Sequence, residues 1–151
     1  MSASNDQLRS EVVSFFASRF GIDREFLSRL AYRERSNEVW AVSAEPPPGI
    51  VSRRPPGLRI LRRTPDGLKP TSAFLIHLGK RITSSRVDLD RGTLESLLLG
   101  RRLETEDENG YVALSFAGDV VGCGRVHRGH LQAVIPTGRR RELLLALDDL
   151  S

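Results

Sequence analysis

Three short apolar runs near the C-terminus constrain the fold most. Tyr111–Phe116, Val120–Val126 and Leu131–Ile135 are rich in β-branched and aromatic residues, and Gly-Asp and Arg-Gly pairs separate them. Runs of this kind with such breaks predict an antiparallel meander of three strands. The middle run contains Gly122 and Gly124, and glycines inside a strand mark a bulge, a barrel corner or a close approach of two backbones. We therefore expect a small, strongly bent sheet.

The N-terminal part of the sequence predicts helices and short strands. Leu8, Val12, Phe16 and Phe20 recur at helical spacing, and Ser4 with Gln7 forms a plausible capping box for that helix. The proline-rich stretch Glu45–Gly57 predicts a loop or linker, and Thr64–Gly67 predicts a turn. The further elements that we expect are a helix at Arg24–Leu30 capped by Asp23, strands at Glu38–Ser43, Leu58–Leu61 and Arg86–Asp88, a helix from Thr71 or Ser72 to Leu78, a helix at Arg91–Leu99 capped by Asp90, and a terminal helix at Arg139–Leu147.

The length and these elements together predict an α+β fold with two small domains. A chain of 151 residues has room for one or two such domains. We place the boundary near Ile82–Ser85, which gives an N-terminal α+β domain at 1–82 and a C-terminal domain at 83–151. The single cysteine excludes an intramolecular disulfide framework, no apolar run is long enough for a membrane helix, and the first residues do not form a signal peptide. We expect a cytoplasmic protein with no membrane partner.

The charge of the chain indicates a polyanionic partner. The formal net charge is +4 and the sequence pI is about 10.0. Of the 23 basic residues only Lys69 and Lys80 are lysines, and arginine binds phosphate through a planar fork. A genome-wide preference for arginine codons explains this composition equally well. It does not explain the clustering at 51–63, a segment without acidic residues that contains Arg53, Arg54, Arg59, Arg62 and Arg63.

Several segments of the chain form a pattern through their order. They are Phe20–Leu27, Asn37–Ser43, Gly67–Gly79, Ile82–Gly100, Gly110–Val112, Gly118, Val121–Val126 and Ile135-Pro136. Taken in this order, they resemble a pre-PUA module followed by a PUA domain, a small pseudo-barrel that binds RNA. The resemblance is closest to the C-terminal tail of Sun-family RNA cytosine-5 methyltransferases, and the pre-PUA module also precedes PUA in some ribosome-assembly factors. The resemblance implies an N-terminal pre-PUA-like module and a C-terminal PUA-like β pseudo-barrel.

The resemblance implies RNA binding rather than methyl transfer. The family's enzymes carry S-adenosylmethionine and a nucleophilic cysteine on a Rossmann-type domain, for which this chain has no room. Cys123 lies between glycines in a predicted strand, where a buried, inert thiol is the usual case. His127 and His130 flank a turn without a cysteine pair, so surface positions beside RNA are favoured over a zinc site. We expect no enzymatic activity, no cofactor and no metal.

The candidate RNA-binding residues are basic side chains at the ends of predicted elements. By the resemblance, RNA lies near the first helix of the barrel and near its final strand and helix. For each single residue, an ordinary solvated surface position stays an equal alternative. The candidates are Lys80, Arg81, Arg91, Arg101, Arg102, Arg125, Arg128, Arg139 and Arg140.

Two functions follow as hypotheses. The first is non-catalytic binding of structured ribosomal or transfer RNA in ribosome biogenesis or RNA modification, by phosphate contacts and shape readout. The second is a protein-interaction subunit that docks on an RNA methyltransferase or a pre-ribosomal protein. Exposed apolar residues of the proline-rich stretch, such as Ile50 and Val51, would serve the second function.

Overall fold

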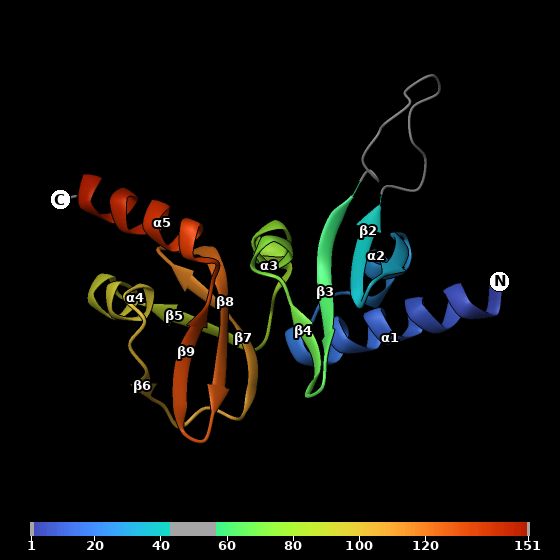
Figure 1. Cartoon of the computed structure of the whole chain (residues 1–151), viewed down its shortest axis with the longest axis horizontal. Coiled ribbons are helices and arrows are strands. Elements are labelled where there is room, and N and C mark those ends of the chain that lie inside the picture. The colour runs from blue at the N-terminus through green and yellow to red at the C-terminus, as the bar shows by residue number, and fades with distance from the viewer. Residues whose placement is uncertain (1, 43–56, 151) are drawn as a thin grey trace.

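The chain forms two β-sheets with helices around them, and helix α3 lies between the sheets (Figure 1). The structure, a computed structural model, describes residues 2–42 and 57–150. Most of the predicted proline-rich loop, with Ile50 and Val51, therefore lies outside the described residues. The helices are α1 (Ser2–Phe20), α2 (Arg24–Ser28), α3 (Ser72–Leu78), the 3₁₀ turn η1 (Gly79–Arg81), α4 (Arg91–Leu98) and α5 (Thr137–Asp149). The strands are β1 (Ala31–Arg35), β2 (Glu38–Val42), β3 (Leu58–Thr64), β4 (Gly67–Pro70), β5 (Arg86–Leu89), β6 (Leu103–Glu104), β7 (Gly110–Phe116), β8 (Asp119–His127) and β9 (His130–Val134).

The first sheet is antiparallel, with the strand order β1-β2-β3-β4, and α1 covers one of its faces. The predicted apolar face of α1 is buried: Val12, Phe16 and Phe20 are fully inaccessible to solvent. They share a core with Val39 and Ile60 of the sheet. The burial of these side chains is the main stabilising contribution in this half, because each buried aromatic or aliphatic side chain contributes about 1.5–3 kcal/mol.

The second sheet contains the predicted meander and curls into a half-barrel. Strands β7, β8 and β9 pair antiparallel in succession, as the sequence predicts. The pairing shifts where Leu114 faces Gly122 and Ser115 faces Val120, so Val121 is an extra residue in β8. Such a bulge bends the strand. Strand β5 pairs parallel with β7, and β6 pairs with β9, which completes the order β5-β7-β8-β9-β6. Helices α4 and α5 pack on this sheet through a second apolar core.

Helix α3 joins the two sheets. The ring of Phe74 packs edge-on against Phe16 of α1, with 4.9 Å between the ring centroids. On the other side, the Ser72 hydroxyl donates to the carbonyl of Val134 and accepts from the backbone N–H of Cys123, both at 3.0 Å. The first core also includes buried residues of β7 and β8. Residues on both sides of the predicted boundary at 82/83 therefore share one core.

The α+β class is confirmed, and so are the three helix caps at Asp23, Thr71 and Asp90, whose side chains accept backbone N–H groups. The start of the first helix was predicted wrongly. Helix α1 begins at Ser2, so Ser4 lies inside the helix and is not its N-cap. The bulged, meandering sheet and the turn between β3 and β4 are also confirmed.

Three strands were not predicted. Strand β1 has only one buried side chain, Tyr32, and its polar residues give no strand pattern. Strand β4 is short and ends at Pro70, a residue that the sequence suggests as a break before α3. Strand β6 consists of two residues, Leu103 and Glu104, and it pairs with the distant strand β9.

Candidate nucleic-acid interface

The face of the first sheet that points away from α1 carries basic side chains around Trp40. Residues directly opposite each other in antiparallel strands lie on the same face of a sheet. Arg33 of β1 faces Trp40 of β2, and Trp40 faces Arg59 of β3. Val39 and Ala41, the neighbours of Trp40 in the strand, point to the opposite face and are buried in the core. This row therefore places a tryptophan between two arginines on the outward face.

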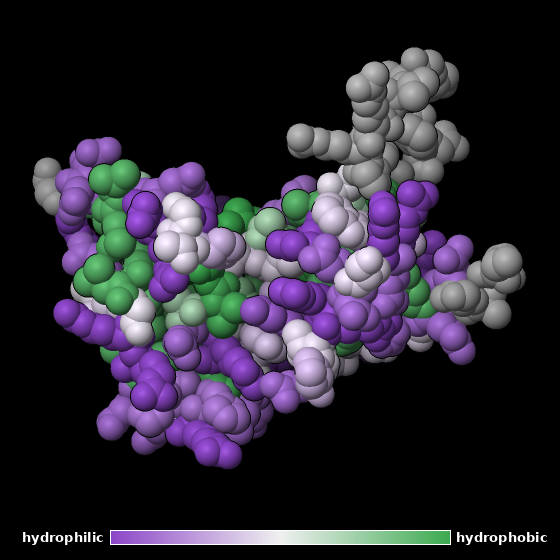
Figure 2. All heavy atoms as spheres, in the orientation of Figure 1, coloured by the Kyte–Doolittle hydropathy of each residue, from purple (hydrophilic) through white to green (hydrophobic). Residues whose placement is uncertain are grey.

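A second row on the same face adds three more basic residues. Arg35 of β1 faces Glu38 of β2, which faces Arg62 of β3, which in turn faces Lys69 of β4. Glu38 is the one acidic residue in the two rows. We call the basic members of both rows, with Trp40, the basic face: Arg33, Arg35, Trp40, Arg59, Arg62 and Lys69. Hydrophilic side chains gather over this part of the molecule in Figure 2.

A β-bulge brings Arg59 and Arg62 onto the same face. Residues three apart in a regular strand point to opposite sides, because the side-chain period is two. Here the register shifts between Val39 and Trp40, and Ile60 is the extra residue of β3. Ile60 and Leu61 are consequently both buried, while both arginines that flank them are exposed.

Part of the basic face forms one wall of a groove with a volume of about 610 Å³. This wall comes from β2, β3 and β4, and the opposite wall comes from β9 and the start of α5. None of the described residues that line the groove is acidic. Its polar and aromatic lining consists of Trp40, Arg59, Arg62, Lys69, Thr71, Ser72, Gln132 and Arg140.

The basic side chains of the groove differ in how they are bound. Arg59 forms an ion pair with Glu38, with 2.9 Å between Nη1 and Oε1, and about half of its side chain is exposed. Arg62 and Lys69 form no ion pair with any residue in the described ranges. Arg140 donates from Nη2 to the Thr137 hydroxyl at 3.1 Å, and its Nε is buried without a hydrogen-bond partner among the described residues. The groove thus offers cationic donors to an anionic ligand.

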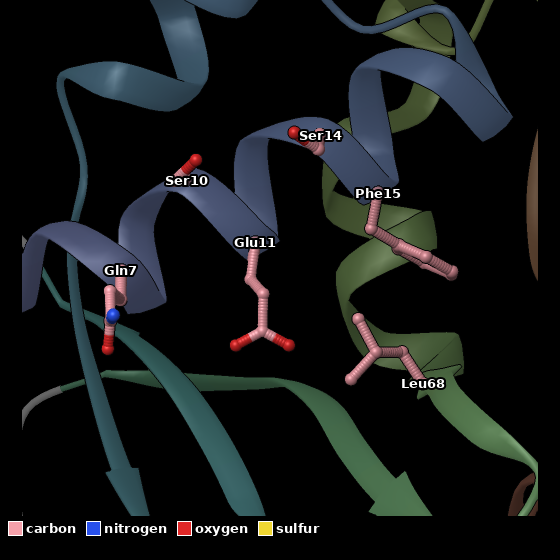
Figure 3. Close-up of a pocket in the computed structure, with 6 residues that line it drawn as sticks. All are labelled: Gln7, Ser10, Glu11, Ser14, Phe15 and Leu68. Atoms are coloured by element: carbon pink, nitrogen blue, oxygen red, sulfur yellow. The ribbon is translucent and has the colours of Figure 1, made fainter. Parts of the chain in front are cut away.

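The hollow on the opposite side of the first sheet has different chemistry. It lies beside α1 and is lined by Gln7, Ser10, Glu11, Ser14, Phe15 and Leu68 (Figure 3). The carboxylate of Glu11 points from α1 toward the sheet and binds Arg63, with 2.7 Å between the nearest atoms. Glu34 binds the same guanidinium at 2.6 Å. The hydrogen bonds that Arg63 donates to both carboxylates raise the pKa of its guanidinium, and the bond that it donates to Glu11 lowers the pKa of that carboxyl. Arg63 therefore links α1 to the sheet and is not available to a polyanion.

Five of the candidate RNA-binding residues do not line the groove. They lie in α4 or in the segments just before and after it. Lys80 and Arg81 belong to η1, and the guanidinium of Arg81 stacks on Phe26, 3.8 Å from the ring centroid. Arg91 forms an ion pair with Glu95 at 3.0 Å. Arg101 and Arg102 follow α4 and are exposed.

The candidate RNA-binding residues from β8 to α5 lie in three places: a smaller hollow, the exposed surface and the groove. Arg125 lies over Tyr111, 5.7 Å from the ring centroid, and lines a smaller hollow of about 390 Å³ with Arg19 and His127. Arg128 occupies the turn between β8 and β9 with a φ of 49°. In α5, Arg139 is exposed and pairs with Glu142 at 3.0 Å. Among the predicted residues, Arg140 is the one that lines the groove.

Sequence reasoning missed the basic face. Arg59 and Arg62 were noted as members of the acid-free arginine cluster, but they were not placed in the site. Arg53 and Arg54 of that cluster lie outside the described residues. The alternation of Arg33 and Arg35, followed by Glu38 and Trp40, is the signal that could have identified a strand face with basic and aromatic residues.

Cys123 and the histidines take no part in the groove. The Cys123 side chain is completely buried, and burial raises the pKa of its thiol to about 12. The thiol is therefore protonated at neutral pH, which agrees with the expected inert cysteine. His127 and His130 occupy exposed positions at the two ends of the β8–β9 turn. The ring of His77 stacks on Phe74.

Comparison with known proteins gives no family for this chain. No protein-family model matches the sequence, and a search of curated proteins finds no match. Within residues 2–42 and 57–150, none of the helices has the length and apolar character needed to cross a membrane.

Proposed function

We propose that this protein binds RNA without catalysing a reaction, through the basic face and the groove beside it. The observation that carries the proposal is the lining of the groove, which includes four cationic side chains and a tryptophan and, among the described residues, no acidic one. Arginine guanidinium groups bind phosphate in a planar, bidentate way. Aromatic side chains supply stacking platforms for bases, and this combination is typical of proteins that bind single-stranded or looped RNA.

The proposed RNA is a structured ribosomal or transfer RNA, and the proposed role is in ribosome biogenesis or RNA modification. This part rests on the resemblance of the sequence to pre-PUA and PUA-like domains. The structural support for it is coarser: the second sheet has a bulge at Val121 and curls into a half-barrel. A separate RNA methyltransferase or a pre-ribosomal protein is the proposed protein partner.

Binding of the purified chain to ribosomal and transfer RNA, compared with a DNA duplex of equal length, tests the proposal. We expect tight, salt-sensitive binding that prefers RNA. Arg140→Ala should weaken binding, because this side chain lines the groove. Arg139→Ala is the matched control, since it removes the same charge from the same helix at a residue already paired with Glu142. Equal effects of the two substitutions, or equal affinity for RNA and DNA, would contradict the proposal.

A second candidate function is docking on another protein. Leu99, Leu145 and Leu150 are each at least 60% exposed, and apolar surface lies over α4 and α5 in Figure 2. Leu145→Ser distinguishes the two candidates. If docking through this surface is the main function, the substitution abolishes capture of the candidate methyltransferase or pre-ribosomal protein and leaves any RNA binding unchanged.

A further inference from the structure

We propose that Trp40 stacks on an unpaired base, so that the ligand of the groove is a single-stranded segment of the RNA. This inference rests on the proposed RNA binding and specifies which part of an RNA the groove accepts. It combines three observations: the position of Trp40 outside both apolar cores, the arrangement of the cations around it, and the size of the groove.

Trp40 is exceptional among the large aromatic side chains because it takes no part in the core. Neither of the two apolar clusters includes it, although its strand neighbours Val39 and Ala41 belong to the first. Its side chain is partly exposed and lines the groove. Among the described residues, no aromatic ring or guanidinium stacks on the indole. A tryptophan buries a large apolar area when it is covered, so the exposed part of the indole in the groove can bind a flat ligand.

The basic residues surround the indole on the same surface. Arg33 and Arg59 are its direct neighbours across the strands, and Arg62 lies on the adjacent row. Neighbouring strands are about 4.8 Å apart, and alternate residues of a strand are about 7 Å apart. A base stacked on Trp40 would therefore have its own phosphate, or the next one, within reach of an arginine. Arg140 and Gln132 line the facing wall, where they can donate hydrogen bonds to phosphate oxygens and base edges.

The size of the groove and the chemistry of stacking exclude a duplex from this position. A volume of about 610 Å³ lies within the range for small ligands, and it suits one or two nucleotides rather than a double helix. Within a duplex, each base face is already covered by its neighbours, so an indole can stack only on a base that is unpaired or at an end. The groove consequently selects a loop, a bulge or a single-stranded end.

Trp40 is the only tryptophan of the chain, and its fluorescence therefore reports directly on the proposed contact. We would titrate the full chain with a short single-stranded RNA of mixed sequence and with the same sequence annealed to its complement. We expect the single strand to quench the fluorescence and to bind more tightly than the duplex. Trp40→Leu should weaken binding of the single strand roughly 5- to 150-fold, the cost of losing one stacked base. Trp40→Phe should retain most of the affinity, because it keeps an aromatic face.

The outcomes separate this inference from the proposed function. If Arg140→Ala weakens RNA binding but Trp40→Leu does not, and the fluorescence is unchanged, the protein binds RNA and the stacking inference is wrong. If the duplex binds as tightly and quenches as strongly as the single strand, the inference is also wrong. If neither short RNA binds but ribosomal or transfer RNA does, the stacking inference is wrong and the proposed function stands; if none of these RNAs binds, both proposals fail. Should Trp40→Leu fail to fold, the quenching of the unsubstituted protein and the affinity of Trp40→Phe still decide the question.

Discussion

The removal of two cations from the groove gives the most quantitative test of its role. Arg62→Ala combined with Arg140→Ala leaves Arg59 and Lys69 to contact phosphates. Binding of a single strand loses affinity with salt at a log–log slope of about −0.7 per phosphate contact. Four contacts give a slope of roughly −2.8 and two contacts give roughly −1.4. An increase from about 50 to 200 mM salt should therefore weaken the unsubstituted protein about 50-fold and the double variant about 7-fold.

The control for this experiment is a second double variant with the same change in net charge. Arg29→Ala combined with Arg139→Ala removes two exposed arginines that are paired with acidic residues on helices α2 and α5. Its slope should equal that of the unsubstituted protein. Filter binding or fluorescence anisotropy over a series of salt concentrations measures all three slopes. Identical slopes for the two double variants would show that the net charge, and not the groove, determines binding, and would refute the reasoning.

Three further predictions concern the folded state. The Cys123 thiol, with its pKa raised to about 12 by burial, should react with a thiol reagent at pH 8 only after the protein is unfolded, which a time course in denaturant checks. Burial raises the pKa of Tyr32 from 10.0 to about 12, so the unfolded chain loses the phenol proton at a lower pH than the folded protein does. Stability should therefore fall as the pH rises from 10 to 12, and Tyr32→Phe should remove this part of the fall in unfolding curves. Gly122→Ala should destabilise the fold by about 1–3 kcal/mol in denaturant unfolding, because its Cβ would lie 2.6 Å from the side chain of Ile135. Gly138→Ala, which meets open space in α5, should instead have a neutral or stabilising effect.

The parts of the fold that depend on local chemistry could be predicted from the sequence. The meander from β7 to β9 follows from apolar runs and tight turns that are adjacent in the chain. The caps at Asp23, Thr71 and Asp90 depend on one side chain and an amide two or three residues away. The strands β1, β4 and β6 could not be predicted, because their polar sequences become strands only through pairing with neighbours.

The groove could not be predicted for a related reason. It depends on the register between β2 and β3, strands separated by a long stretch of sequence, and on the bulge at Ile60. A one-residue change of register would move every side chain of a strand to the other face. The resemblance directed attention to basic residues in the second half of the chain, and of these Arg140 lines the groove while Arg139 pairs with Glu142.

Adjacent arginines in this chain consequently have different roles, because the backbone directs their side chains to opposite faces of the sheet. Arg62 and Arg63 are neighbours in β3, so strand alternation directs the first to the basic face and the second toward α1. Arg63 is surrounded by Glu11 and Glu34, and its charge is already compensated within the fold. Arg62 has no acidic partner among the described residues, and its charge remains available. The count of arginines therefore overstates the surface that a polyanion can use. Charge that stays uncompensated after folding is the quantity that a salt-dependence experiment measures.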